Sequence, residues 1–129
     1  MKHDWKDPFD AVRDVGLTMP GVVASTKYDG SPVLKMRGCF MAGLATHESA
    51  EADTLVVRSG LEERDRLIED APDAYYLTDY YRGHPLVLVR LSHVDRHALR
   101  DLLCVSWRMA AAKVGKRRVA AKTTRAARP

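Results

Sequence analysis

Lys and Arg residues are concentrated at one end of the chain. Residues 113–129 contain seven Lys or Arg and no Asp or Glu, whereas residues 1–112 contain fourteen against seventeen. A segment of charge +7 therefore follows a region of charge −3. Such a segment attracts polyanions, because each Lys or Arg that meets a phosphate releases a counterion. The alternative is a solvated segment that only aids solubility. The residues predicted to contact nucleic acid are Lys113, Lys116, Arg117, Arg118, Lys122, Arg125 and Arg128.

Three further basic residues lie beside predicted hairpin turns. Lys27 precedes the turn signal at Asp29-Gly30, while Lys35 and Arg37 lie at the next turn. Basic side chains at hairpin tips can act as wings that contact the phosphate backbone of DNA. The alternative is a solvated sheet edge, where Lys discourages aggregation.

The chain contains no Asn and no Gln. These side chains make the bidentate contacts that recognise adenine in the major groove. If the protein binds DNA, we therefore expect it to recognise phosphate and shape, with little preference for sequence.

Four tyrosines fall within residues 73–84, and three consecutive residues there could form a stacking surface with a neighbouring cation, as in single-strand binders. These three are Tyr80, Tyr81 and Arg82. The alternative is that the rings pack a loop against the sheet and point their hydroxyl groups outward.

No arrangement of residues indicates catalysis or metal binding. His93 and His97 are four residues apart, but a zinc site needs three or four ligands, and neither cysteine has a Cys or His neighbour in sequence. Cys39 and Cys104 fall in a predicted strand and a predicted helix, which favours a role in packing. We find no nucleophile elbow, Walker loop or dinucleotide fingerprint. The sequence thus predicts a binding protein rather than an enzyme, with no cofactor and no metal.

The order of local signals predicts an α+β fold, with a disordered basic C-terminal tail or one that extends the last helix. Residues 1–112 form the predicted domain and residues 113–129 the tail. A helix should begin at Asp7-Pro8, and a capping box of Ser59 and Glu62 should open another that ends near Asp70. The last helix should begin near Asp95, with Trp107 as the anchor of its core. Strands are expected at residues 22–28, 33–36, 39–44, 54–58 and 85–91, the first four as an antiparallel meander.

The order and spacing of short motifs over residues 7–110 resemble those of the MmcQ/YjbR family of small bacterial proteins. The matching segments are Phe9-x-x-Val12-Arg13, Met19-Pro20-Gly21-Val22, Thr26-x-Tyr28-x-Gly30-x-Pro32, Arg37 to Leu44, Glu63-Arg64, Tyr75 to Tyr81, Val87 to Leu91, Leu102-Leu103 and Ser106-Trp107. The resemblance implies a CyaY-like fold, in which helices pack on a curved antiparallel sheet. It also implies DNA binding through a double-wing arrangement, and it implies no catalytic residues.

The remaining expectations concern location and partners. The chain has no apolar run near the ~18 residues that a membrane span needs, and residues 1–7 lack the apolar core of a secretory signal. Two distant cysteines are not a disulfide framework. We expect a cytoplasmic monomer, with association with the nucleoid as an option. DNA is the expected partner, and the alternative is a non-catalytic module whose sheet surface binds a protein or a small ligand.

Overall fold

The protein is built on one open six-stranded sheet in which every pair of neighbouring strands is antiparallel. The structure is a computed structural model and describes the backbone of residues 7–126, with side chains as far as Arg117. Across the sheet the strands run in the order β1-β2-β3-β4-β6-β5. Their bounds are β1 Val22–Thr26, β2 Pro32–Met36, β3 Cys39–Leu44, β4 Thr54–Arg58, β5 Tyr75–Tyr76 and β6 Leu86–Arg90.

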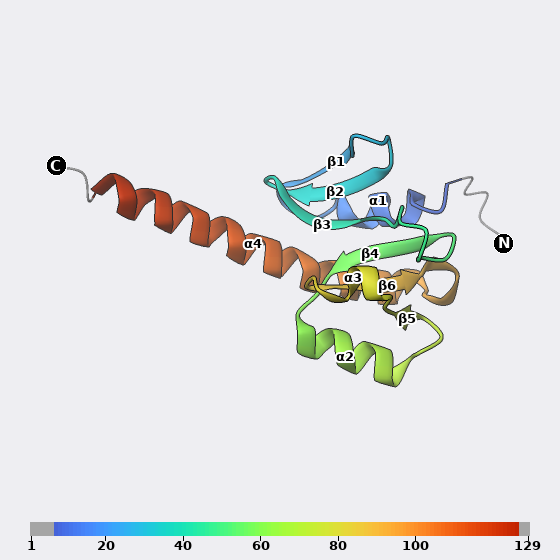
Figure 1. Cartoon of the computed structure of the whole chain (residues 1–129). Coiled ribbons are helices and arrows are strands. Elements are labelled where there is room, and N and C mark those ends of the chain that lie inside the picture. Colours follow the sequence, from blue (N-terminus) through green and yellow to red (C-terminus); the bar gives the residue numbers. More distant parts are fainter. Residues whose placement is uncertain (1–6, 127–129) are drawn as a thin grey trace.

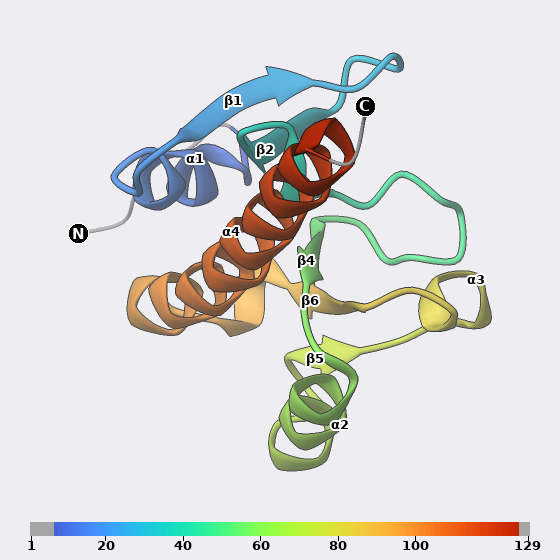
Figure 2. The same cartoon turned by 90° about the vertical axis from the view of Figure 1, so that its left-hand side faces the viewer.

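Helices cover one face of this sheet and loops cover part of the other (Figures 1 and 2). The helices are α1 Asp10–Gly16, α2 Leu61–Asp70, α3 Asp79–Arg82 and α4 Arg96–Ala126, with a short 3-10 turn η1 at Leu91–His93. Helices α1 and α4 lie side by side on one face, while α2 lies beyond β5 at the edge (Figure 2). Helix α3 and the loop between β3 and β4 lie on the second face. The predicted α+β fold with packed helices is confirmed, and the meander has the predicted turns.

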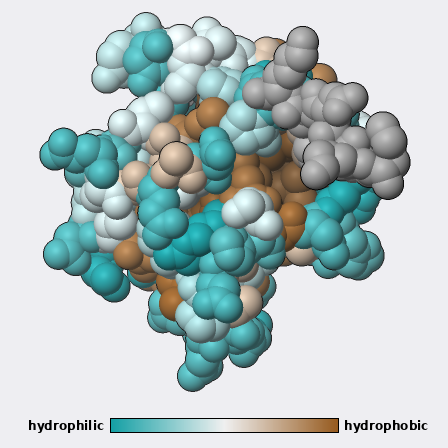
Figure 3. Space-filling model, turned by 90° about the vertical axis from the view of Figure 1, so that its right-hand side faces the viewer, coloured by the Kyte–Doolittle hydropathy of each residue, from teal (hydrophilic) through white to brown (hydrophobic). Residues whose placement is uncertain are grey.

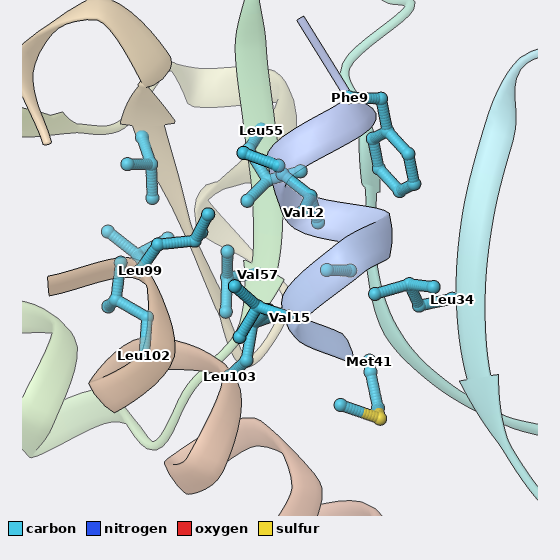
Figure 4. Packing of buried hydrophobic residues seen from close by; sticks show 14 of the residues in the cluster. Phe9, Val12, Val15, Leu34, Met41, Leu55, Val57, Leu99, Leu102 and Leu103 are labelled. Atoms are coloured by element: carbon cyan, nitrogen blue, oxygen red, sulfur yellow. The ribbon is translucent and has the colours of Figure 1, made fainter. Parts of the chain in front are cut away.

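The main core fills the space between the sheet and its two covering helices (Figure 4). Phe9 just before α1, Val12 and Val15 of α1 and Leu103 of α4 are fully buried there. They pack on the inward-facing side chains of the strands, among them Leu34. Each such side chain contributes about 1.5–3 kcal/mol when it leaves water, so this cluster is the main stabilising term of the fold.

Helix α4 starts where the sequence predicted, whereas α1 starts at Asp10 rather than at Pro8, with Phe9 in its cap position. The backbone N–H of Phe9 donates to Asp7 Oδ1 at 2.9 Å in the turn that leads into α1, and Ala98 N–H donates to Asp95 Oδ1 at 2.8 Å at the start of α4. The predicted capping box of α2 does not form. Ser59 is buried and its hydroxyl donates to the carbonyl of Gly60. Gly60 therefore takes the cap position, and α2 begins one residue later than expected.

The sequence predicted Trp107 as the anchor of the core, and this prediction is wrong. Its ring is only half-buried, and its indole Nε1–H donates to the carbonyl of Pro20 at 2.8 Å. The central positions under α4 are held by Leu103 and Ala110, which are fully buried. A bulky indole fits better at the margin of the sheet, where its N–H can reach a backbone acceptor.

A buried arginine fastens α2 to the chain between α3 and β6. Arg64 is only 8% exposed. Its Nη1 donates to the carbonyl oxygens of Arg82 at 3.3 Å, His84 at 2.9 Å and Leu86 at 3.4 Å. A charged donor makes stronger hydrogen bonds than a neutral one, and removing it would take that donor away from three backbone acceptors.

We expect Arg64→Ala to lower the free energy of unfolding by about 2–4 kcal/mol, because it removes a buried charged donor from backbone acceptors. Urea unfolding followed by circular dichroism measures this loss. Arg66→Ala on the same helix is the control, since that side chain is 65% exposed and should change stability by less than about 0.5 kcal/mol. Equal losses in the two variants would contradict the role given to Arg64.

Candidate nucleic-acid interface

Helix α4 crosses the sheet and then continues past its end. Along the sheet it is fixed by the fully buried Ser106, whose hydroxyl donates to the carbonyl of Met41 at 2.8 Å. Ala111 and Val114 are the last residues of α4 that pack on the core. From Gly115 to Ala126 the helix extends away from the sheet (Figure 1). The sequence predicted a tail that is either disordered or an extension of the last helix. In the structure the backbone as far as Ala126 continues the last helix.

Three basic residues are exposed at the start of this extension, and one of them lies on the side of the helix that faces the sheet. Lys113, Lys116 and Arg117 are exposed. Arg117 follows the buried Ala110 by seven residues, about two turns and ~10 Å along the axis. It therefore lies on the side of α4 that faces the sheet, just beyond the point where the sheet ends.

The hairpin turn between β2 and β3 lies at this same end of the sheet. Arg37 is exposed in this turn and has a left-handed backbone with φ of 49°. Its N–H donates to the carbonyl of Gly21 at 3.2 Å, and the neighbouring Pro20 accepts the indole N–H of Trp107. The turn of Arg37 is thus linked, through Gly21 and Pro20, to Trp107 in the part of α4 that precedes Lys113. We call Arg37, Lys113, Lys116 and Arg117 the basic corner.

Lys27 does not belong to the basic corner. It lies in the turn between β1 and β2, and successive turns of a meander fall at opposite ends of the strands. Lys35 lies between the two, exposed on β2. The sequence predicted these residues as wing contacts at two turns, and the structure places Lys27 a full strand away from Arg37.

Four of the residues predicted to contact nucleic acid have side chains that the structure does not describe. The backbone places Arg118, Lys122 and Arg125 in the helical extension of α4. Arg128 lies outside the described residues. The charge of the segment is nevertheless set by its sequence, and its helical backbone carries that charge away from the sheet.

Acidic residues are concentrated elsewhere in the molecule. Helix α2 contains five Asp or Glu in ten residues, and it lies beyond β5. Residues 22–44, which form the first three strands and their turns, contain only one acid, Asp29, against three basic residues. The pKa of Asp29 is lowered by hydrogen bonds from Ser31, first of all from its hydroxyl, so this carboxylate is held charged within its own turn. The strands nearest the basic corner are therefore net positive.

The second face of the sheet carries two residues that the sequence analysis missed, Phe40 and Arg58. Arg58 ends β4, and its Nε donates to the carbonyl of Phe40 at 2.7 Å. Together with His84, Pro85 and Leu86 they line a hollow of about 190 Å³. Neither residue stands out in sequence, since each reads as an ordinary member of a strand, and only the strand register brings them together.

The tyrosines hold a loop against the second face, as the alternative interpretation predicted, but the hydroxyl groups of Tyr76 and Tyr81 make hydrogen bonds within the protein rather than pointing outward. Tyr81 is only 8% exposed, and its hydroxyl accepts the backbone N–H of His47 at 3.3 Å. Its ring is therefore not available to stack on a base, which corrects the stacking prediction at this residue. Tyr80 is 58% exposed, but the ring of His47 lies against it at 3.5 Å. Arg82 is exposed and pairs with Asp79 at 3.6 Å.

A bidentate ion pair closes the same loop at its other side. Arg90 donates from Nε and Nη2 to the two carboxylate oxygens of Glu51, at 2.9 and 2.8 Å. The guanidinium also lies over the ring of Tyr76, 4.2 Å from its centroid. The hydrogen bond from Arg90 lowers the pKa of Glu51 below its ordinary value of 4.5, and Glu51 in turn raises the pKa of Arg90.

We expect Glu51→Gln to lower the melting temperature by a few degrees at pH 7, because it removes the charge that pairs with Arg90. Since the folded pKa of Glu51 lies below the unfolded one, its contribution is present above pH 4.5 and is lost as the pH falls through the lower, folded pKa. The difference in melting temperature between wild type and variant should therefore shrink at about pH 3. Glu48→Gln in the same loop is the control, and a difference that stays constant with pH would contradict the assignment.

A cleft of about 250 Å³ lies between α2, α4 and the sheet, away from the basic corner. Leu67, Leu102 and Val105 line it, and Glu63 and Asp101 lie at its border. Tyr75 also lines it. Burial raises the pKa of this tyrosine, and the carboxylates of Asp95 and Asp101 raise it further. Arg58 lines the cleft as well, so its largely apolar lining carries two carboxylates against one guanidinium.

The other residues considered for chemistry are not gathered into a site. His93 and His97 are exposed, Cys39 is buried and Cys104 is half-buried. Within the described residues no group of three His, Cys, Asp or Glu is placed to hold a metal ion. No helix in the same part of the chain is both long and apolar enough to cross a lipid bilayer.

The end of the molecule opposite to the basic corner has a different character. Apolar side chains gather there among polar ones (Figure 3). A hollow of about 280 Å³ lies between the start of α1 and the start of α4, lined in part by Pro8, Leu91 and Leu99. The two ends of the sheet therefore offer different surfaces to a partner.

Comparisons with known proteins add little about function. No known family profile matches the chain, and no solved structure matches it. The uncharacterized protein Mb2600 of Mycobacterium bovis and the uncharacterized protein Rv2570 of Mycobacterium tuberculosis are each 40% identical over 47 residues. The match covers 36% of this chain and 36% of each relative, so the chain spans about a third of their length. The resemblance to the MmcQ/YjbR family stays a prediction.

Proposed function

We propose that the protein binds nucleic acid, DNA in the first instance, by contacting its phosphates. The observation that carries the proposal is the basic corner, where α4 leaves the sheet beside the Arg37 turn. Exposed basic side chains from two elements lie at this end of the sheet, and the helix continues with a segment that contains no acid. Phosphate contacts by Lys and Arg supply most of the affinity of non-specific binding.

The composition supports binding with little sequence preference. A chain without Asn or Gln lacks the usual readers of adenine, and contacts to phosphate carry no sequence information. The resemblance to the MmcQ/YjbR family, which implies DNA binding, points in the same direction. We propose that the protein acts as a monomer in the cytoplasm, on the nucleoid, and that it is not an enzyme.

A second candidate function is binding of a protein or small ligand by a surface of the globular domain. The cleft between α2 and α4 favours this function, because its largely apolar lining suits an apolar ligand rather than a phosphate group. With two carboxylates, Glu63 and Asp101, against one guanidinium, Arg58, its lining favours a neutral or positively charged partner. This function needs neither the basic corner nor low salt, so a binding experiment separates the two.

We expect the variant in which Lys113, Lys116 and Arg117 are all changed to Ala to bind a fluorescein-labelled duplex about tenfold or more weakly than wild type. The slope of log affinity against log salt should also become less negative by roughly 2 to 3, because up to three phosphate contacts are lost. Fluorescence anisotropy over a salt series measures both quantities.

Lys27→Ala is the matched control, since it also removes a positive charge but at the opposite end of the sheet. It should leave affinity and salt slope almost unchanged. If wild type does not bind at about 50 mM salt, where electrostatic binding is strong, the proposed function fails. Binding that the triple variant retains in full would place the site elsewhere on the protein.

A further inference from the structure

The second face of the sheet is covered over only part of its width. The loop between β3 and β4 packs with α3 over Val56 and Leu88, at the centre of that face. On β1 and β2 the same face is open: Val23 is 61% exposed and Lys35 is exposed beside it. Within the described residues, no helix covers this part of the sheet (Figure 2).

Phe40 lies at the border between the covered and the open part. It pairs with Lys35 across β2 and β3, and Arg58 is attached to its carbonyl oxygen from the other side. A Cβ atom at Gly43 would meet Phe40 Cε1 at 3.4 Å, so the ring extends over this glycine along the face of the sheet. An aromatic ring that lies on an open sheet with a cation on each side has the arrangement of a stacking platform for bases.

The two cations are available to a ligand. Among the described residues, no ion pair engages Lys35 or Arg58, and the Nη atoms of Arg58 make no hydrogen bond. The hollow of about 190 Å³ beside Phe40 and Arg58 gives a base or sugar a place to settle. Its remaining lining, His84, Pro85 and Leu86, is flat or apolar.

This platform and the basic corner are joined around the end of the sheet. Lys35 lies on the second face of β2, and Arg37 follows two residues later in the turn at the end of the same strand. Beyond that turn lies the extension of α4, which belongs to the other face. A nucleic acid that contacts all of them must bend around the end of the sheet. A single strand bends this way readily, whereas a duplex, with a persistence length of about 150 base pairs, does not.

We propose that the protein binds single-stranded nucleic acid, with one base stacked on Phe40, phosphates held by Lys35 and Arg58, and the strand passing Arg37 to the extension of α4. This inference rests on the proposed function, because the basic corner supplies the electrostatic affinity for either form of nucleic acid. It adds a site that only an unpaired base can occupy, and therefore a preference for single strands.

The test compares Phe40→Leu with wild type on three labelled probes of about 12 nucleotides, a length that suits one binding module: oligo-dT, oligo-U and a DNA duplex. Leucine keeps an apolar side chain beside the covered part of the face but offers no aromatic surface. Tyr28→Leu is the matched control, since Tyr28 is fully exposed in the turn at the opposite end. Thermal melting followed by circular dichroism confirms that each variant is folded before binding is measured.

We expect wild type to bind one or both single strands more tightly than the duplex, and Phe40→Leu to weaken single-strand binding about tenfold while duplex binding stays unchanged. The dT and U probes distinguish DNA from RNA as the preferred strand. The platform would be overturned if Phe40→Leu bound single strands as tightly as wild type, or if Tyr28→Leu lost single-strand affinity instead. Either result would leave the proposed function standing. Wild type that binds none of the three probes would overturn both.

Discussion

The packing of α4 on β3 is the constraint on which the rest of the structure depends. Ser106 is fully buried, and its hydroxyl reaches a carbonyl of β3, while Leu103 and Ala110 fill the space on either side. The hydroxyl of Ser106 can be buried in the core because the carbonyl of Met41 accepts its hydrogen bond. This contact sets both the position and the rotation of α4, so it also decides on which side of the helix the basic residues emerge beyond the sheet.

The same constraint separates the charges of the molecule. Helix α2, with its five acids, lies at the β5 edge and is fastened there by Arg64, whereas the basic extension of α4 leaves at the end where Arg37 turns. A chain with similar numbers of acids and bases can attract phosphate only if the two are kept apart, because exposed charges are screened beyond ~10 Å at 0.1 M salt. The fold achieves this separation with one long helix and one edge helix.

Local signals in the sequence predicted most of the elements, and tertiary contacts decided the rest. The turns at Gly30 and Gly38 have positive φ, as turn residues should, and α4 begins next to Asp95, as predicted. Ser59 failed as a cap because its side chain is buried beside the end of β4, where its hydroxyl bonds to Gly60. The two-residue strand β5 was not predicted, since such a short strand is defined only by its pairing with β6.

The candidate site shows the same division. The charge of residues 113–129 is visible in the sequence, but the rotation of α4 that brings Arg117 to the side of the sheet is not. Phe40, Lys35 and Arg58 come from three strands, and a bulge between β2 and β3 sets which of their side chains share a face. A register of this kind depends on the core pattern of the whole sheet rather than on local spacing.

The most direct test of the account is to map where nucleic acid binds, residue by residue. Oligo-dT is added to the ¹⁵N-labelled protein and the shifts of its backbone amide signals are followed by NMR. We expect the largest shifts at residues 35–40, around Arg58 and residues 84–86, and along α4 from Lys113 onward. Shifts confined to the turn at Tyr28, or to the cleft between α2 and α4, would contradict it.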